Sequence, residues 1–454
     1  MTPPFGTRAR RLFHSRALLF LGFAFAVMAD PVSSVAYAIE AALRALRGDL
    51  GVLLPTMVLV VGIIGIVVAN YQQIVARYPR GGGAAAAVGE AFGADWAFLP
   101  LGALIVDFAL TIAISAAAAA SAVIAYLPGV AGDRVIIAVA LLSAVAGLSW
   151  FGHGGRLLFA TMTLAFVVVA AVMLVSSFGV AAPLAVRQSS PPAWDVGRLV
   201  AVMLAFPVAM ALATGVEAPS SAIAQLGGID DTGRRWFGRW TLWLTLIVVG
   251  SLTLALTAAS VRLGNGIPAA NATQLAELAR RSAPGIIFAL FQLTSATLLL
   301  AAASSSFQAG PGLLKALARG RTGSGILPEP LGRTNRHHTP VWGVLVFLLA
   351  SGGTVVAAGG RDQELVLFYA VAVFISFLAG LAAMARLDWT EGRIRRFPLN
   401  VVGLVLVAFT LAVNLARGQP VVSLAASIAI ALALRHGWIR AGRPAGLARE
   451  AVPE

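Results

Sequence analysis

The stretch ADPVSSVAYAIEAAL, residues 29–43, puts an aspartate and a proline in the middle of an apolar run that begins near residue 17. A second stretch, ATGVEAPSS at residues 213–221, does the same with a glycine, a glutamate and a proline. Proline removes a backbone donor from a helix and clashes with the preceding turn, and glycine lowers helix stability. The two stretches therefore predict apolar helices that break near their centres, at Pro31 in the first and at Gly215 and Pro219 in the second.

The composition around these stretches is that of a membrane protein. Of the 454 residues, 59% are hydrophobic and only 11% are charged, whereas soluble domains carry roughly 25% charged residues. The chain has no cysteine, which excludes disulfides, thiolate metal sites and cysteine nucleophiles. We therefore expect an all-α protein that crosses the lipid bilayer many times, and we exclude a soluble enzyme, a disordered protein and a secreted scaffold.

The apolar runs predict about twelve membrane spans, since a bilayer-spanning helix needs ~20 apolar residues. The predicted spans are 17–45, 51–75, 95–127, 134–151, 156–178, 197–228, 238–261, 283–316, 341–358, 364–387, 397–416 and 420–437. The two breaks fall in the first and sixth spans, five spans apart, and both contain a proline followed by two serines. Broken helices at matching places in two halves of opposite topology are typical of inverted-repeat transporters and point to their binding sites.

Charge distribution predicts the orientation. Twelve spans place both termini on one side, and 23 of the 33 lysine and arginine residues then lie on that side. Because basic residues accumulate in cytoplasmic loops, both termini are expected in the cytoplasm, with the protein in the plasma membrane, a bacterial inner membrane. The same rule accounts for the net charge of +14, so no nucleic-acid partner is expected.

The predicted organisation follows from these spans. A cytoplasmic tail (1–16) precedes a transporter core (17–390), which contains a first repeat (17–180) and a second, inverted repeat (197–390). Two additional transmembrane helices (391–437) and a short cytoplasmic tail (438–454) complete it.

Three acidic residues lie inside predicted spans: Asp30, Asp107 and Glu217. A charge near the bilayer centre costs several kcal/mol, and none of the three has a basic residue at comparable depth in its own span. Internal salt bridges are therefore a poor explanation for them, and we expect them to bind a substrate.

Four hydroxyl-bearing residues share helix faces with these acids, because they lie three, four, seven or eight positions away: Tyr37, Thr111, Ser115 and Thr214. Carboxylates, hydroxyls and the carbonyls of unwound helices are the oxygen ligands of hard cations. We predict that the three acids supply charge, the four hydroxyl residues supply neutral oxygens, and unwound backbone near Asp30 and Gly215 supplies carbonyls. The bound species is then a small inorganic cation. Three carboxylates exceed what one monovalent ion requires, so one of them can carry a coupling proton.

These motifs resemble the amino acid–polyamine–organocation (APC) superfamily, and within it the potassium importers of the KUP and KimA type. ADPVSSVAYAIEAAL (29–43), LIVDFALTIAIS (104–115) and ATGVEAPSS (213–221) are similar to their first, third and broken sixth spans. Three further stretches resemble other parts of these proteins: NYQQIVARYPRGGG (70–83), TSATLLLAAASSSFQAGPGLL (294–314) and YAVAVFISF (369–377). The resemblance covers about residues 15–390.

The resemblance implies a secondary active transporter, not an enzyme, with the five-plus-five inverted-repeat LeuT/APC fold. It implies import of potassium with protons, without any cofactor. The potassium site that it implies consists of Asp30, Tyr37, Asp107, Thr111, Ser115, Thr214 and Glu217. Phe108 stands where relatives tend to have tyrosine. Members usually carry a C-terminal cytosolic domain for regulation and dimerisation, whereas about 17 residues follow the last predicted span here. We expect that domain to be absent, and the oligomeric state stays open.

The alternative function is a proton-coupled amino-acid permease on the same fold. Such permeases typically bind the substrate carboxylate at a glycine-rich break in the first span, and many sodium-independent ones place a lysine in the fifth. Here the first break contains Asp30, which repels a carboxylate, and residues 156–178 contain no lysine. Potassium, other monovalent cations and amino acids stay open as substrates. The glycines at 81–83 are not followed by the Gly-Lys-Ser/Thr of a P-loop and predict a tight turn.

Overall fold

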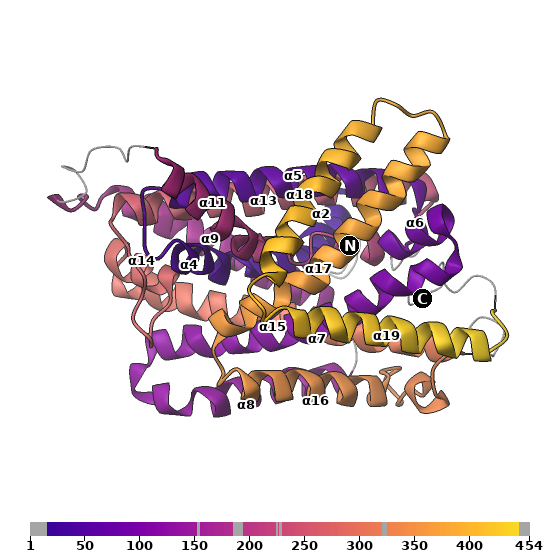
Figure 1. Cartoon of the computed structure of the whole chain (residues 1–454). Helices are drawn as coiled ribbons and strands as arrows, with labels where there is room; N and C mark the ends of the chain where they lie inside the picture. Colours follow the sequence, from indigo (N-terminus) through magenta and orange to yellow (C-terminus); the bar gives the residue numbers. More distant parts are fainter. Residues whose placement is uncertain are drawn as a thin grey trace, which may run out of the picture.

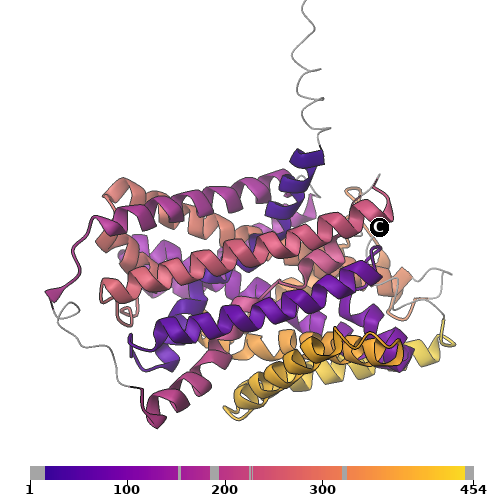
Figure 2. The same cartoon turned by 90° about the horizontal axis from the view of Figure 1, so that it is seen from above.

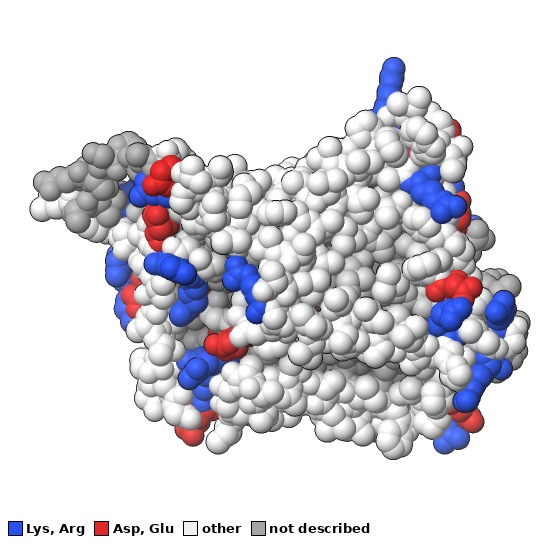
Figure 3. Space-filling model, in the orientation of Figure 1, with Lys and Arg blue, Asp and Glu red and all other residues white. Residues whose placement is uncertain are grey.

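The computed structural model describes residues 16–151, 155–184, 194–223, 226, 229–319 and 325–444, and these residues form helices and turns without a β-strand. The predicted tails at 1–16 and 438–454 fall mostly outside the described residues. Ten of the described helices are long and apolar enough to cross a membrane, and two shorter ones, Ala17–Val27 and Val341–Ala357, are also apolar. Figure 3 shows charged residues gathered toward the two ends of the molecule, with a broad band between them almost free of charge on this face. This arrangement is that of a multi-pass membrane protein.

The helices shown in Figure 1 have the following bounds. They are α2 (Arg16–Val27), α3 (Ala29–Ser33), α4 (Val35–Ala45), α5 (Leu53–Arg77), α6 (Gly83–Phe92), α7 (Phe98–Tyr126), α8 (Arg134–Trp150), α9 (Gly155–Phe178), α11 (Val196–Ala209), α12 (Ala218–Ala222), α13 (Asp231–Arg262), α14 (Gln274–Ser282), α15 (Gly285–Arg319), α16 (Val341–Ala357), α17 (Asp362–Thr390), α18 (Phe397–Leu415) and α19 (Val421–Arg440). Four 3₁₀ helices join them: η1 (Ala94–Ala97), η2 (Pro128–Asp133), η3 (Met210–Ala213) and η5 (Glu329–Gly332).

The first predicted span is interrupted, but less than the sequence suggests. Its three pieces α2, α3 and α4 are separated by single residues, Met28 and Ser34. Helix α2 ends at Val27, the residue whose carbonyl would accept a hydrogen bond from Pro31 if proline had an N–H. The expectation of an unwound backbone at Asp30 is therefore wrong in this structure, because Asp30 lies inside the helical turn of α3.

The sixth predicted span unwinds fully. Helix α11 tightens into η3, and Thr214 then adopts an extended ψ of 131°. Gly215 follows with a φ of +70°, a left-handed backbone conformation that residues other than glycine rarely adopt. The helix resumes at α12, where Pro219 occupies the first turn, a position that needs no N–H donor.

Serine hydroxyls bond to backbone carbonyls in the same way at both breaks. Ser33 and Ser34 donate to the carbonyls of Asp30 and Pro31 at 2.7 and 2.6 Å. In the sixth span, Ser220 and Ser221 donate to the carbonyls of Glu217 and Ala218 at 2.7 and 3.1 Å. The Ser34 hydroxyl also reaches across to the carbonyl of Leu212 at 3.0 Å, so the two broken segments are bonded to each other.

The unbroken helices form a support around these segments. Helix α7 packs along α15, α17 and α19, and α5 packs along α13; Figure 2 shows α5, α13 and α9 running side by side. The α7–α19 contact is a close backbone approach, since a Cβ atom on Gly102 would lie 2.5 Å from the carbonyl oxygen of Ser427. In Figure 1, α17 and α18 form a steeply inclined hairpin beside this group.

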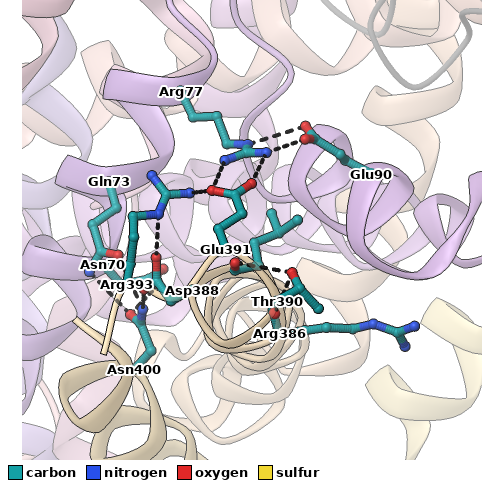
Figure 4. Close-up of polar contacts among 11 residues, drawn as sticks. Asn70, Gln73, Arg77, Glu90, Arg386, Asp388, Thr390, Glu391, Arg393 and Asn400 are labelled. Atoms are coloured by element: carbon teal, nitrogen blue, oxygen red, sulfur yellow. Dashed lines mark hydrogen bonds and ion pairs between the residues drawn. The ribbon is translucent and has the colours of Figure 1, made fainter. Parts of the chain in front are cut away.

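A polar cluster at the end of α5 joins helices that are distant in sequence (Figure 4). The guanidinium of Arg77 pairs with Glu90 of α6 and, at 2.7 Å, with Glu391, which follows α17. Arg393 in turn pairs with Glu391 and with Asp388 of α17. Figure 4 shows these five side chains meeting between α5, α6 and α17.

Asn400 of α18 extends this polar cluster into the protein. Its amide donates to Asp388 at 2.8 Å and to Gln73 at 3.1 Å, and its oxygen accepts from Asn70 at 2.9 Å. The side chains of Asp388, Asn70 and Asn400 are fully buried. The cluster therefore fixes the short helix α6, which follows the glycine turn at 81–83, against the long helices.

Candidate functional site

A cavity of about 150 Å³ lies where the two broken segments meet α7 and α15. All three acids predicted from the sequence line it: Asp30, Asp107 and Glu217. Its other walls come from α2 (Phe23, Ala26, Val27), α7 (Leu104, Phe108), α9 (Phe159), the second break (Gly215, Ala218, Ser221, Ala222) and α15 (Ser305, Ser306, Gln308, Ala309, Leu313). We call this space the cation cavity, after the ion that the sequence predicts to bind here. None of the described residues that line it is basic.

Asp30 and Gly215 form the contact between the two breaks. A Cβ atom on Gly215 would lie 2.6 Å from Oδ2 of Asp30 and 2.9 Å from Cδ of Pro31. The carboxylate of the first segment thus lies directly on the unwound backbone of the second. The other carboxylate oxygen of Asp30, Oδ1, is buried and has no hydrogen-bond partner among the described residues. An atom of this kind is a ready ligand for a cation.

Asp107 and Glu217 approach each other across the cavity. Their carboxyl groups lie within hydrogen-bonding distance, and two carboxyl groups can share a hydrogen bond only when one carries a proton. Asp30 is close enough to interact electrostatically with both. The Oε2 atom of Glu217 is buried without a hydrogen-bond partner among the described residues. The site therefore contains carboxyl groups that can carry protons and buried oxygen atoms that can act as ligands.

The four predicted hydroxyl residues are not among the residues that line the cation cavity. Tyr37, Thr111, Ser115 and Thr214 are all buried, and none of them lines the cavity itself. The side chains of Tyr37 and Thr214 are neighbours, and the Thr214 hydroxyl donates to the carbonyl of Ala211 at 2.6 Å. The Oγ atom of Ser115 has no hydrogen-bond partner among the described residues. The structure thus brings the three acids to the cavity wall, while the four hydroxyl residues are buried outside its lining.

No cluster of three or more histidine, aspartate or glutamate side chains in the described residues has the arrangement of a metal site. The three acids line an open space and do not form a closed set of ligands around one point. Such an open arrangement suits a transported ion, which must be released, better than a resident metal ion, which needs a closed ligand shell.

Gln308 is a cavity residue that the sequence analysis did not single out. It lies in α15 shortly after the polar run of serines at 304–306, from which Phe307 separates it. Its amide offers a neutral oxygen in the wall of the cavity. The signal that could have found it is the polar run itself, although uncharged residues in a span are far less costly, and so less informative, than acids.

A family model described as amino acid permease matches residues 18–434. The chain belongs to the amino acid permease family. The match spans nearly every described helix, including both broken segments and the acids of the cation cavity. The chain is therefore a membrane transporter of the APC superfamily, as the motifs of the sequence predicted.

This transporter is also similar to the potassium transporter KimA of Bacillus subtilis (strain 168). The two are 27% identical over an alignment of 394 positions, which covers 83% of this chain and 62% of KimA. The chain thus spans less than two thirds of the length of that relative.

Proposed function

We propose that this transporter imports a small monovalent cation, potassium, together with protons. The observation that carries the proposal is the convergence of three acids from three separate spans on one cavity without a basic residue in its wall. An uncompensated group of carboxylates inside an apolar bundle attracts cations and excludes anions. The similarity to a protein named as a potassium transporter supports the choice of ion.

We further propose that the helices form the five-plus-five inverted repeat of the LeuT/APC fold, with α2–α4 and α11–α12 as the equivalent broken spans. The matching serine-to-carbonyl bonds at both breaks support this equivalence. The cavity extends from Asp30 toward the start of α2 and the last turns of α15. Since basic residues favour the cytoplasmic side, we propose that this end, with Arg77 and Arg319, faces the cytoplasm and that the structure is inward-facing.

The proposed transport step uses the two charge states of the site. With Asp30, Asp107 and Glu217 carrying one proton among them, a potassium ion bound by Asp30 Oδ1 and neighbouring oxygens leaves one negative charge. Release of the ion toward the cytoplasm becomes easier when this one proton moves from one carboxyl group to another. The helix breaks at Met28 and at Thr214–Glu217 provide the hinges.

An amino-acid substrate is the second candidate function. The cavity has room for about five water molecules, each occupying roughly 30 Å³ in the liquid, so a small amino acid fits as well as a partly hydrated ion. The match to a family described as amino acid permease favours this candidate, whereas the acidic, non-basic wall disfavours it because a substrate carboxylate finds no positive partner there.

Proteoliposomes with a pH-sensitive dye inside test both candidates. We expect potassium uptake with acidification of the lumen in the wild type, and neither in Asp107→Asn, which keeps the shape but removes the charge. Asp95→Asn is the matched control, because Asp95 lies at the surface in a pair with Arg435 at 2.7 Å, and it is expected to transport normally. Potassium entry without acidification would show that transport is not coupled to protons. Uptake from a labelled amino-acid mixture without potassium flux would establish the second candidate.

A further inference from the structure

A second, smaller cavity lies on the other side of Glu217. It has a volume of about 50 Å³ and lies between the turn that begins α6 and helices α5, α7, α12 and α17. Four of its wall residues carry hydroxyl groups, and we call it the hydroxyl chamber: Tyr71, Ser220, Ser221 and Ser376. Gly82–Ala85, Pro100, Leu101, Leu104 and Glu217 complete its wall.

The hydroxyl chamber and the cation cavity share one wall. Three residues line both spaces, namely Leu104, Glu217 and Ser221. Of these, only Glu217 has an ionisable side chain. Its buried Oε2 atom makes no hydrogen bond within the described part of the chain, so it is available to water on either side. Glu217 is thus a titratable group placed between two separate spaces.

The hydroxyl chamber is closely built. A Cβ atom on Gly83 would lie 3.0 Å from Oγ of Ser220, so the chamber has its present width only because glycine stands there. The ring of Tyr71 is held by an edge-to-face contact with Phe377, with centroids 5.9 Å apart. Tyr71, Ser220 and Ser376 are each less than 7% exposed. The polar cluster around Arg77 fixes helix α6, which forms part of the chamber wall, to the end of α17.

The size and chemistry of the chamber suit protons better than potassium. It has room for one or two water molecules, at roughly 30 Å³ each, and Glu217 is the only acid among the described residues that line it. Hydroxyl groups both donate and accept hydrogen bonds, so together with such waters they form a chain along which a proton can move. A potassium ion would have to give up most of its hydration there for a single carboxylate.

We propose that the hydroxyl chamber is the proton route of this transporter, leading to Glu217 separately from the route of the cation. This inference rests on the proposed function. On the cytoplasmic side, the O–H bond of protonated Glu217 breaks, its proton passes to a chamber water, and the carboxylate keeps the electron pair. The cation leaves through the cation cavity. Because the two ions do not share a path, neither has to wait for the other to clear it.

The absence of cysteine from the chain allows a direct test by thiol labelling in proteoliposomes. Ser376→Cys places a single thiol in the hydroxyl chamber, and Ala309→Cys places one in the cation cavity. A small methanethiosulfonate reagent then attaches a group to each thiol in protein that has already folded, and the same sample before labelling is the reference. The wild type has no thiol and controls for reagent effects.

Two transport modes are measured on each sample. Exchange of external radioactive rubidium for internal ions needs no net proton release, whereas accumulation driven by a pH gradient does. Labelling of Ser376→Cys is expected to lower gradient-driven accumulation by about tenfold or more, the effect of losing a positioned proton carrier, while exchange stays within about twofold. Labelling of Ala309→Cys is expected to lower both modes together.

Three results would overturn the proton route. They are equal loss of both modes on labelling Ser376→Cys, unchanged accumulation after complete labelling, or failure of the thiol to react, since a proton route must be open to water. Failure of the proposed function itself is distinguishable, because wild-type protein would then show no rubidium exchange before any reagent is added.

Discussion

Gly215 has no room for a side chain beside Asp30, since a Cβ atom there would lie 2.6 Å from Oδ2 of the carboxylate. The position of this acid is therefore set by the backbone of a span 185 positions later in the chain. A change in the backbone of the unwound turn at 214–217 therefore displaces the carboxylate of Asp30. Conversely, the charge state of this carboxylate affects the conformation of the turn.

Gly215→Ala is expected to abolish transport and to destabilise the protein by about 1–3 kcal/mol, because alanine is strained at a φ of +70° and its methyl group displaces Asp30. Uptake assays and thermal unfolding in detergent measure the two effects. Gly62→Ala is the matched control, since nothing lies within 4 Å of its Cβ position; it should be neutral or slightly stabilising. Wild-type uptake by Gly215→Ala would show that the contact has no functional role.

Ser34→Ala removes the hydrogen bonds to the carbonyls of Pro31 and Leu212. We expect a loss of about 1 kcal/mol in the free energy of unfolding, with slower uptake because the two broken segments are no longer bonded. Ser33→Ala is the comparison, as it loses only the local bond to the carbonyl of Asp30. If both variants transport equally well, the bond between the segments does not contribute to the cycle.

Asn400→Ala tests the polar cluster of Figure 4. It leaves Asp388, Asn70 and Gln73 without bonds that they now share with Asn400, so we expect a loss of about 2–3 kcal/mol. Asn414→Ala, in the same helix, removes a single side-chain bond, to the carbonyl of Pro207, and should cost about 1 kcal/mol. Equal thermal stabilities of the two variants would contradict the bracing role of the cluster.

The same cluster predicts a dependence of stability on pH. Hydrogen bonds from Arg77 lower the pKa of the Glu391 carboxyl below its ordinary value of 4.5. The folded protein thus prefers the ionised form, so the stabilisation is complete above pH 4.5 and is lost as the pH falls through the lower, folded pKa. Since Glu391 is 37% exposed, the effect should stay below about 1 kcal/mol.

Unfolding midpoints measured at neutral pH and below pH 4.5 check this prediction. In Arg77→Gln we expect a lower midpoint at neutral pH and a smaller fall on acidification than in the wild type. Arg80→Gln serves as the control, because its pair with Asp231 is exposed and contributes little. A steeper acid dependence in Arg77→Gln than in the wild type would reverse the sign and refute the argument.

The sequence predicted the helices and the acids of the site for the same physical reason. Apolar runs of ~20 residues have few alternatives to a membrane helix, and a carboxylate inside such a run is too costly to be incidental. Asp30, Asp107 and Glu217 were therefore recognisable one by one, and the structure lines one cavity with all of them.

Other features depended on contacts between distant segments. Helical spacing placed Tyr37, Thr111 and Ser115 on the faces of the acids, but it could not show that they are buried outside the lining of the cavity. Pro31 predicted an unwound segment, yet the helix is interrupted only at single residues. The hydroxyls of Ser33 and Ser34 donate hydrogen bonds to the nearby carbonyls. The hydroxyl chamber combines residues from five helices and the turn before α6, so no local sequence pattern predicts it.

The backbone approach of α7 and α19 at Gly102 separates the molecule into a frame and a moving part. Two helices in such contact cannot roll against each other without a collision, so Asp107, one and a half turns along α7 from Gly102, belongs to the frame. Asp30 and Glu217 lie beside interruptions of the helical backbone and belong to the part that can rock. If the proposed function is correct, a cation bound by all three acids bridges the boundary between these two parts, so that binding of the ion also restrains their movement relative to each other.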